Sequence, residues 1–146
     1  MIWLEKIARA FFDDEGRLLR TVGVVADVAD RKQAELALRE SEERFRQVAN
    51  TAPVMIWMSG RDKMCTYFNQ QWLDFTGRPL EAELGNGWAK GVHPEDLTAC
   101  LEIYQQTFDK QEVFIMRHRL RRNDGEYPWI ENKGAPRFEA DGSFAG

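Results

Sequence analysis

The chain of 146 residues is long enough for one domain with some linker. Hydrophobic residues make up 43% and charged residues 30% of it, which matches ordinary globular proteins and excludes wholesale disorder. The formal net charge of −4 argues against nucleic acid as a partner, because no overall basic field surrounds the protein to attract phosphates.

Membrane-directing segments are absent from the sequence pattern. No apolar run approaches the roughly 20 residues that cross a bilayer. Residues 1–12 include three charged side chains and lack the apolar centre of a signal peptide. We therefore expect a cytoplasmic protein with no membrane partner for this part of the sequence.

The N-terminal region predicts a β-hairpin. Two apolar runs, at residues 2–12 and 18–28, flank the polar turn 13–16, and the second run is rich in β-branched valine. An internal repeat involves the same region, because Trp3 and Gly16 are separated by the same interval as Trp129 and Gly142. The two copies are residues 3–20 and residues 129–146, and the first continues into residues 21–30.

Residues 30–49 predict a helix. Asp30 is placed to cap its first turn, and Gln33 completes the spacing of a capping box. Its apolar positions make one narrow stripe, so we expect it to pack against a second helix or its own domain. The stripe consists of Ala34, Leu38, Phe45 and Val48.

The rest of the chain, residues 50–146, predicts one α+β unit. A helix should begin at His93-Pro94, because Pro94 suits the first helical position and acidic residues follow it. An earlier short helix should close at Gly77, with irregular structure over 81–91. The expected strands are 54–58, 64–68, 112–122 and 126–133, and the expected helices are 69–76 and the one from residue 93.

An ordered set of short segments then carries a family resemblance. Together they resemble the PAS sensor domain, in the subclass common in bacterial sensor histidine kinases. Asp27 to Lys32 is similar to the segment that ends one PAS domain and opens the connecting signalling helix. The segments are Asn69-x-x-Trp72, Phe75-Thr76-Gly77, Gly87-Trp88, Val92-His93-Pro94-Glu95-Asp96, Arg119 to Tyr127, and Trp129-Ile130.

The resemblance implies an α+β fold: a PAS-like five-stranded antiparallel sheet with helices on one face, preceded by a β-hairpin and a linker helix. It implies that residues 1–29 are the C-terminal strands of a preceding PAS-like domain, 30–48 the signalling helix, and 49–146 a PAS domain lacking its last strand. The chain departs from the family at Ala29, at Arg117-His118 and at Pro128, where a bulge or sheet edge is expected.

The resemblance also implies a function. We expect a sensory or regulatory module of a multidomain signalling protein, a sensor histidine kinase, whose output kinase domain is a partner. No catalytic segment, metal site or cofactor is predicted, although a small-molecule ligand is an option. The alternative is a ligand-free dimerisation or protein-interaction module. Signal transmission is assigned to Asp27, Asp30, Ala34, Leu38, Phe45 and Val48.

The last strand of a PAS sheet lies in the middle, between the first and the penultimate strands. Without it, unpaired backbone groups would each cost roughly 1–3 kcal/mol, so we expect the gap to be filled. The segment 18–27 corresponds to that strand. A helix over 30–48 spans roughly 28 Å, and the five residues before the next strand reach at most about 18 Å. A strand-swapped homodimer is therefore predicted.

Several aromatic and polar residues are candidates for the lining of a PAS ligand pocket. In the strand 112–122, Met116 and His118 share the face expected beneath the helices. His118 is either a satisfied core residue or a polar contact to a ligand. For the tryptophans, the simpler interpretation is that they are core residues. The full set is Trp57, Phe68, Trp72, Trp88, Met116 and His118.

The remaining reactive side chains have structural interpretations. His93 has no second histidine or cysteine at metal-ligand spacing, so a structural or capping role is expected. Cys65 and Cys100 supply neither a disulfide framework nor a zinc cluster, and the expected role is that of small buried hydrophobes.

Overall fold

The computed structural model describes residue 2 and residues 4–146 of the chain. It divides into two compact units, Met1–Phe45 and Arg46–Gly146, which are described separately. Among the described residues, no helix combines the length and the hydropathy that a membrane span requires.

The first unit contains a long antiparallel hairpin. Strand β1 (Leu4–Phe12) pairs with β2 (Leu18–Asp27) in a register that ends at the Phe12–Leu18 pair. The hairpin prediction is confirmed. Along both strands only Phe11 is even partly buried within this chain.

The internal repeat is visible in hydrogen bonds, although Trp3 lies outside the described residues. In the first copy the Asp13 N–H donates to the Arg17 carbonyl at 2.9 Å, and in the second the Glu139 N–H donates to the Ser143 carbonyl at 2.8 Å. Phe138 and Phe144 pair as an isolated bridge, as Phe12 pairs with Leu18. The two copies therefore share one turn geometry.

Helix α1 (Ala29–Thr51) follows the hairpin and is three residues longer than the predicted helix. Its capping group differs from the prediction. The Ala29 N–H donates to Asp27 Oδ1 at 2.9 Å, while Asp30 lies inside the first helical turn. Asp27, two residues before the helix, reaches a free amide, which the already helical Asp30 is less well placed to do.

The second unit begins with a short two-stranded sheet, β3 (Trp57–Ser59) paired with β4 (Cys65–Phe68). The predicted strand 54–58 was therefore placed too early. The Ile56 N–H donates to the Asn69 side chain, and the Val54 carbonyl accepts from it. A side chain thus satisfies the backbone that a sheet partner would otherwise bond.

The helices of this unit come next: α2 (Gln70–Thr76), α3 (Leu80–Glu83), the 3-10 helix η1 (Gly87–Gly91) and α4 (Pro94–Lys110). The predicted stop at Gly77 is confirmed, because this residue caps α2 in the left-handed conformation. The predicted capping role of His93 is also confirmed, since its side chain accepts a hydrogen bond from the Glu95 N–H. The segment predicted to be irregular contains α3 and η1.

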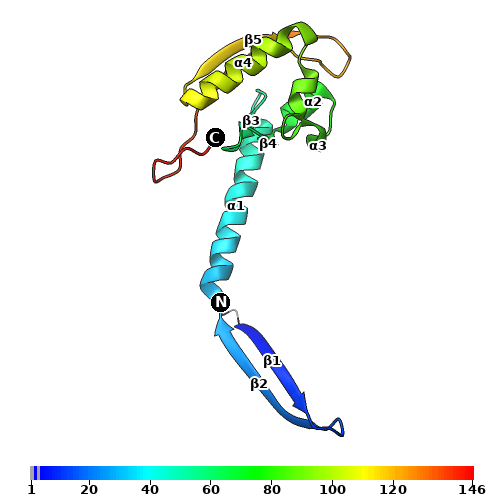
Figure 1. Cartoon of the computed structure of the whole chain (residues 1–146), viewed down its shortest axis with the longest axis vertical. Coiled ribbons are helices and arrows are strands. Elements are labelled where there is room, and N and C mark those ends of the chain that lie inside the picture. Colours follow the sequence, from blue (N-terminus) through cyan, green and yellow to red (C-terminus); the bar gives the residue numbers. More distant parts are fainter. Residues whose placement is uncertain (1, 3) are drawn as a thin grey trace. The chain divides into compact units, whose positions relative to one another are not determined.

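Strands β5 (Phe114–Arg119) and β6 (Trp129–Gly134) form a second antiparallel pair, with helix α4 beside β5 (Figure 1). The predicted alternation along β5 is confirmed. Phe114, Met116, His118 and Leu120 are buried, whereas Ile115 and Arg117 are exposed. Strand β6 starts at Trp129, three residues later than the predicted strand 126–133, because Pro128 has no backbone donor.

The α+β class is confirmed, but the described strands form separate pairs instead of one five-stranded sheet. β3 pairs with β4, and β5 pairs with β6. Half of the buried residues in the core between these pairs and the helices are aromatic. It contains Cys65, Phe68, Trp72, Trp88, Val92, Cys100, Tyr104, Phe114, Met116 and Leu120.

Candidate functional site

An interior cavity lies at the centre of the aromatic core. Five of the six predicted ligand-pocket residues contribute to its lining, and His118 does not. The cavity volume is about 10 Å³, no more than one water molecule needs. The predicted residues that line it are Trp57, Phe68, Trp72, Trp88 and Met116, joined by Cys65, Tyr104, Phe114 and Asn132.

Most polar groups around this cavity bind other protein groups. Trp57 Nε1 donates to Asn132 Oδ1 at 2.9 Å. The Tyr104 hydroxyl donates to the Lys63 carbonyl at 3.0 Å. These hydrogen bonds hold the rings of Trp57 and Tyr104 in defined orientations. Beside them, the Phe68 ring packs against the Trp72 ring at a centroid distance of 4.8 Å.

Two buried polar side chains have no hydrogen-bond partner among the described residues, the Trp88 indole and the His118 imidazole. His118 is 1% exposed, and burial lowers its pKa below 6.5. It is therefore buried as predicted, and the choice between a core residue and a ligand contact stays a prediction. Buried groups of this kind call for an explanation, which a ligand or an ordered water supplies.

The cysteines fit their predicted structural role, since both are buried and free. Burial, reinforced by the charge of Glu83, raises the pKa of Cys65 to about 12, and burial also raises the pKa of Cys100. Both side chains are thus thiols at neutral pH and poor nucleophiles. Within the described residues, no group of histidine, cysteine and acidic side chains is placed to hold a metal ion.

A buried carboxylate ties the helices together. Glu83 is 1% exposed, and its Oε2 accepts from Trp72 Nε1 at 2.7 Å. Arg78 Nε lies 2.9 Å from Glu83 Oε1 and completes the pairing. This arrangement fixes the ring of Trp72, one wall of the cavity, to helix α3.

A second polar centre joins the C-terminal end of helix α1 to the core. The fully buried Asn69 side chain donates from Nδ2 to the Ala49 carbonyl at 2.7 Å and to the Val54 carbonyl at 2.9 Å. Its Oδ1 accepts from the N–H groups of Ile56 and Trp72 at 2.9 and 3.2 Å. One side chain thus connects the last turns of α1, the approach to β3 and the first turn of α2.

The predicted transmission residues lie at both ends and along one side of α1. Asp27 supplies the N-terminal cap, and Asp30 occupies the first turn. The stripe residues Ala34, Leu38, Phe45 and Val48 are all exposed in this chain. An apolar stripe of this kind is typical of a helix that packs along one face.

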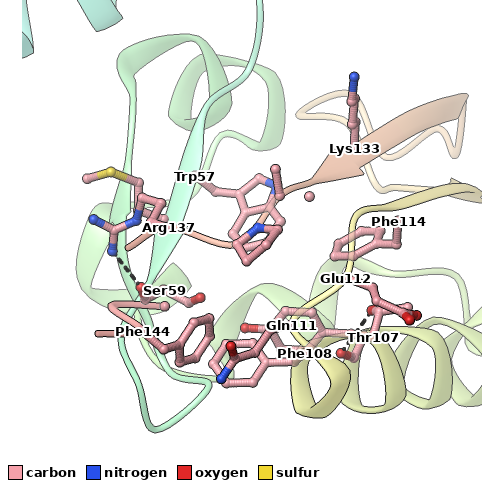
Figure 2. Close-up of a pocket in the computed structure, with 16 residues that line it drawn as sticks. Trp57, Ser59, Thr107, Phe108, Gln111, Glu112, Phe114, Lys133, Arg137 and Phe144 are labelled. Atoms are coloured by element: carbon pink, nitrogen blue, oxygen red, sulfur yellow. Dashed lines mark hydrogen bonds between the residues drawn. The ribbon is translucent and has the colours of Figure 1, made fainter. Parts of the chain in front are cut away.

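A groove of about 100 Å³ opens between β3 and the end of β6, over the C-terminal part of α4. Figure 2 shows Trp57, Phe108, Phe114 and Phe144 around it, with Lys133 extending away. The two strands do not pair with each other, and the Ser59 carbonyl accepts from Arg137 Nη2 at 2.9 Å instead of from another strand.

Sequence reasoning missed Asn69, Glu83 and Asn132 as organising residues. The Asn69-x-x-Trp72 spacing signals an N-cap, and the structure confirms the cap but adds contacts to three other segments. Glu83 and Asn132 bond residues 11 and 75 positions away, and no local pattern signals such pairs.

The chain is similar to a known family and to several known proteins. The family model described as PAS fold matches residues 66–145, more than half of the chain. The uncharacterized protein y4lL of Sinorhizobium fredii (strain NBRC 101917 / NGR234) is 40% identical over 144 residues, 99% of this chain and 17% of that protein. The peroxide stress-activated histidine kinase mak1 of Schizosaccharomyces pombe (strain 972 / ATCC 24843) is 31% identical over 131 residues, 80% of this chain and 8% of the kinase.

A solved structure supports the fold. A domain of the putative light and redox sensing histidine kinase from Haloarcula marismortui superposes with a TM-score of 0.52 at 22% identity. The superposition covers 70% of this chain and 90% of that domain. The chain spans less than a fifth of the length of the relatives described above. The family match, the relatives and this fold together show that the chain belongs to the PAS fold family.

Proposed function

We propose that this chain is a sensory module that relays the state of its core to a kinase output domain through helix α1. The observation that carries the proposal is the Asn69 side chain, which bonds the Ala49 carbonyl of α1 and the Trp72 N–H beside the cavity. A change in the packing of Trp72 alters the bonding of the helix end, and a ligand that favours one arrangement shifts the population. Similarity to a histidine kinase supports the choice of output.

The domain assignment follows from the same proposal. Residues 1–29 are the last strands of a preceding PAS-like domain, 30–48 are the signalling helix, and 49–146 are the PAS domain. The shared turn geometry of the two repeat copies supports the first assignment. A cytoplasmic location remains a prediction from the sequence.

The relay is tested by hydrogen exchange. Replacing Trp88 by alanine enlarges the cavity without touching Asn69, and the relay predicts faster exchange of the amides at the C-terminal end of α1. Replacing exposed Ile115 by alanine is the control, and the exchange at the same amides should not change. Equal exchange in wild type and the Trp88 variant would contradict the relay.

A second candidate function is the ligand-free interaction module. The small volume of the interior cavity favours it, because about 10 Å³ leaves no room for an organic ligand without rearrangement. The unpartnered groups of Trp88 and His118 favour a ligand. Native mass spectrometry of the purified protein with an absorbance scan separates the two, since a sensor with a resident ligand carries extra mass and the interaction module carries none.

We further propose that the module is a homodimer, with exchange of strand β2 between copies. The groove between β3 and β6 supports this idea, because both strands have an edge without a strand partner among the described residues. The repeat supports β2 as the occupant, since Leu18 corresponds to Phe144 and the strand after Leu18 would continue along β6. Exchange requires β2 to separate from β1.

Light scattering across protein concentrations tests the association. A dimer is expected for the whole chain, and a chain that starts at residue 49 should have lost it. A whole chain that stays monomeric at every concentration would refute the exchange, and so would an unchanged oligomeric state after the truncation.

A further inference from the structure

A hollow of about 410 Å³ lies where three segments of the second unit meet, away from the interior cavity and the groove. The segments are the end of α2 with residues 77–78, the end of η1 at residues 90–91, and the loop 121–123. Four of the lining residues are cations and none is acidic. The cations are Arg78, Lys90, Arg121 and Arg122.

Hydrogen bonds to backbone carbonyls hold the walls of this basic hollow in place. The Asn123 N–H donates to the Phe75 carbonyl at 2.8 Å, and Asn123 Nδ2 donates to the Asp74 carbonyl at 2.9 Å. The Arg121 N–H donates to the Gly91 carbonyl at 2.8 Å. At Gly77 a Cβ atom would lie only 2.8 Å from Asn123 Cβ, so the two loops are in close contact.

Two of the four charges are already compensated. Arg78 pairs with buried Glu83, and Arg122 donates from Nε and Nη2 to Asp124 Oδ2 at 2.9 and 2.6 Å. The side chains of Lys90 and Arg121 make no ion pair or hydrogen bond with any described residue. The hollow therefore concentrates positive charge on a chain whose net charge is −4.

We propose that this hollow binds a small multivalent anion that carries phosphoryl or carboxyl groups. Guanidinium groups offer planar forked donors to such oxygens, and an ammonium group adds a point charge. The volume falls within the range of small-molecule sites. Arg78 is held in place by Glu83 and by its Nη2 bond to the Ala82 carbonyl at 3.0 Å, which leaves Nη1 for the ligand. The site is independent of the proposed relay.

Isothermal titration with tripolyphosphate and, separately, with citrate tests the site in the whole chain at low ionic strength. We expect saturable binding of at least one of the two at one ion per chain, weakened by added sodium chloride because the contacts are exposed. The double substitution Lys90→Gln with Arg121→Gln should weaken it at least tenfold. Preference for tripolyphosphate or for citrate would identify the phosphoryl or the carboxyl class.

The matched control removes two exposed charges elsewhere in the same unit, Arg61→Gln with Lys110→Gln, neither of which lines the hollow. This variant has the same net charge as the test variant and should bind within threefold of wild type. Circular dichroism of both variants should match wild type, since all four positions are exposed. No saturable binding by wild type, or equal losses in the two double variants, would overturn the site.

Discussion

The hairpin and the core unit use apolar residues in opposite ways. In the hairpin, Ile7 is 69% exposed and Val24 is 68% exposed, although they face each other across the strands. In the core unit, Leu120 is completely buried, between η1 and the β6 side of the sheet. Strands pair in both units, but only the second unit has a cluster of buried apolar side chains.

This contrast supports the proposal that the hairpin packs against an outside partner. A two-stranded hairpin is marginal alone in water, and burying a Val, Leu or Ile side chain is worth about 1.5–3 kcal/mol. The exposed strands therefore agree with the proposal that they belong to a preceding domain or exchange between copies. The core unit has its own aromatic centre and does not share this requirement.

The largest effect is expected for Leu120→Ala in the core unit. Removing a fully buried leucine should lower the free energy of unfolding by about 3 kcal/mol, from lost transfer energy and a residual cavity. Urea unfolding monitored by tryptophan fluorescence measures it. Ile115→Ala, in the same segment but 61% exposed, is the control and should cost less than about 1 kcal/mol. Equal losses would mean that the outer face of β5 is also covered.

Asn69→Ala should cost about 2–3 kcal/mol, because four backbone groups lose the side chain that satisfies them. Asn50→Ala is the matched control. Among the described residues, the exposed Asn50 side chain accepts only from the Gln70 N–H, at 2.9 Å, and its loss should cost about 1 kcal/mol or less. Thermal unfolding of both variants compares them, and a larger loss at Asn50 would contradict the central place given to Asn69.

A pH-dependent effect is expected from His118. Burial lowers its pKa in the folded state, so the unfolded chain binds the proton more tightly. Stability should fall as the pH drops below about 6.5, by at most about 1.4 kcal/mol per pH unit for one proton. His118→Leu should reduce this dependence between pH 7 and 5. Urea midpoints over that range measure the pH dependence. If it is unchanged in the variant, a group other than His118 causes it.

The smallest effect is expected in the hairpin. Val24→Thr should change the unfolding free energy of the monomeric chain by less than about 0.5 kcal/mol, since the side chain is already in water. If β2 exchanges between copies, the same substitution should weaken the dimer instead. Comparison of unfolding at low and high protein concentration separates these outcomes, and a loss of 2 kcal/mol or more in the monomer would break the contrast between the two units.

Local features of the fold were predictable from the sequence, and features that depend on distant partners were not. Gly77 and His93-Pro94 mark helix ends through their own backbone chemistry, and the alternation over 114–120 indicates which face is buried. The strand expected at 54–58 and the cap expected at Asp30 were wrong. In the first case a side chain 13 residues away from Ile56 took the backbone bond, and in the second the aspartate that precedes the helix, Asp27, did.

The candidate site divides along the same line. The family resemblance led to six candidate pocket residues, and five of them line one cavity. The volume of that cavity, the buried pairing of Glu83 with Arg78 and the basic hollow all arise where segments far apart in the chain meet. A single sequence contains no local pattern that predicts contacts between distant segments.

The close contact at Gly77 has an evolutionary consequence. A side chain at position 77 would collide with Asn123 and would also strain the left-handed backbone, with φ at 65°. Descendants of this sequence that acquire a larger residue there must move the loop 121–123 and, with it, one wall of the basic hollow. Glycine at this position is thus a marker by which homologous sequences that keep the hollow can be sorted from those that have lost it.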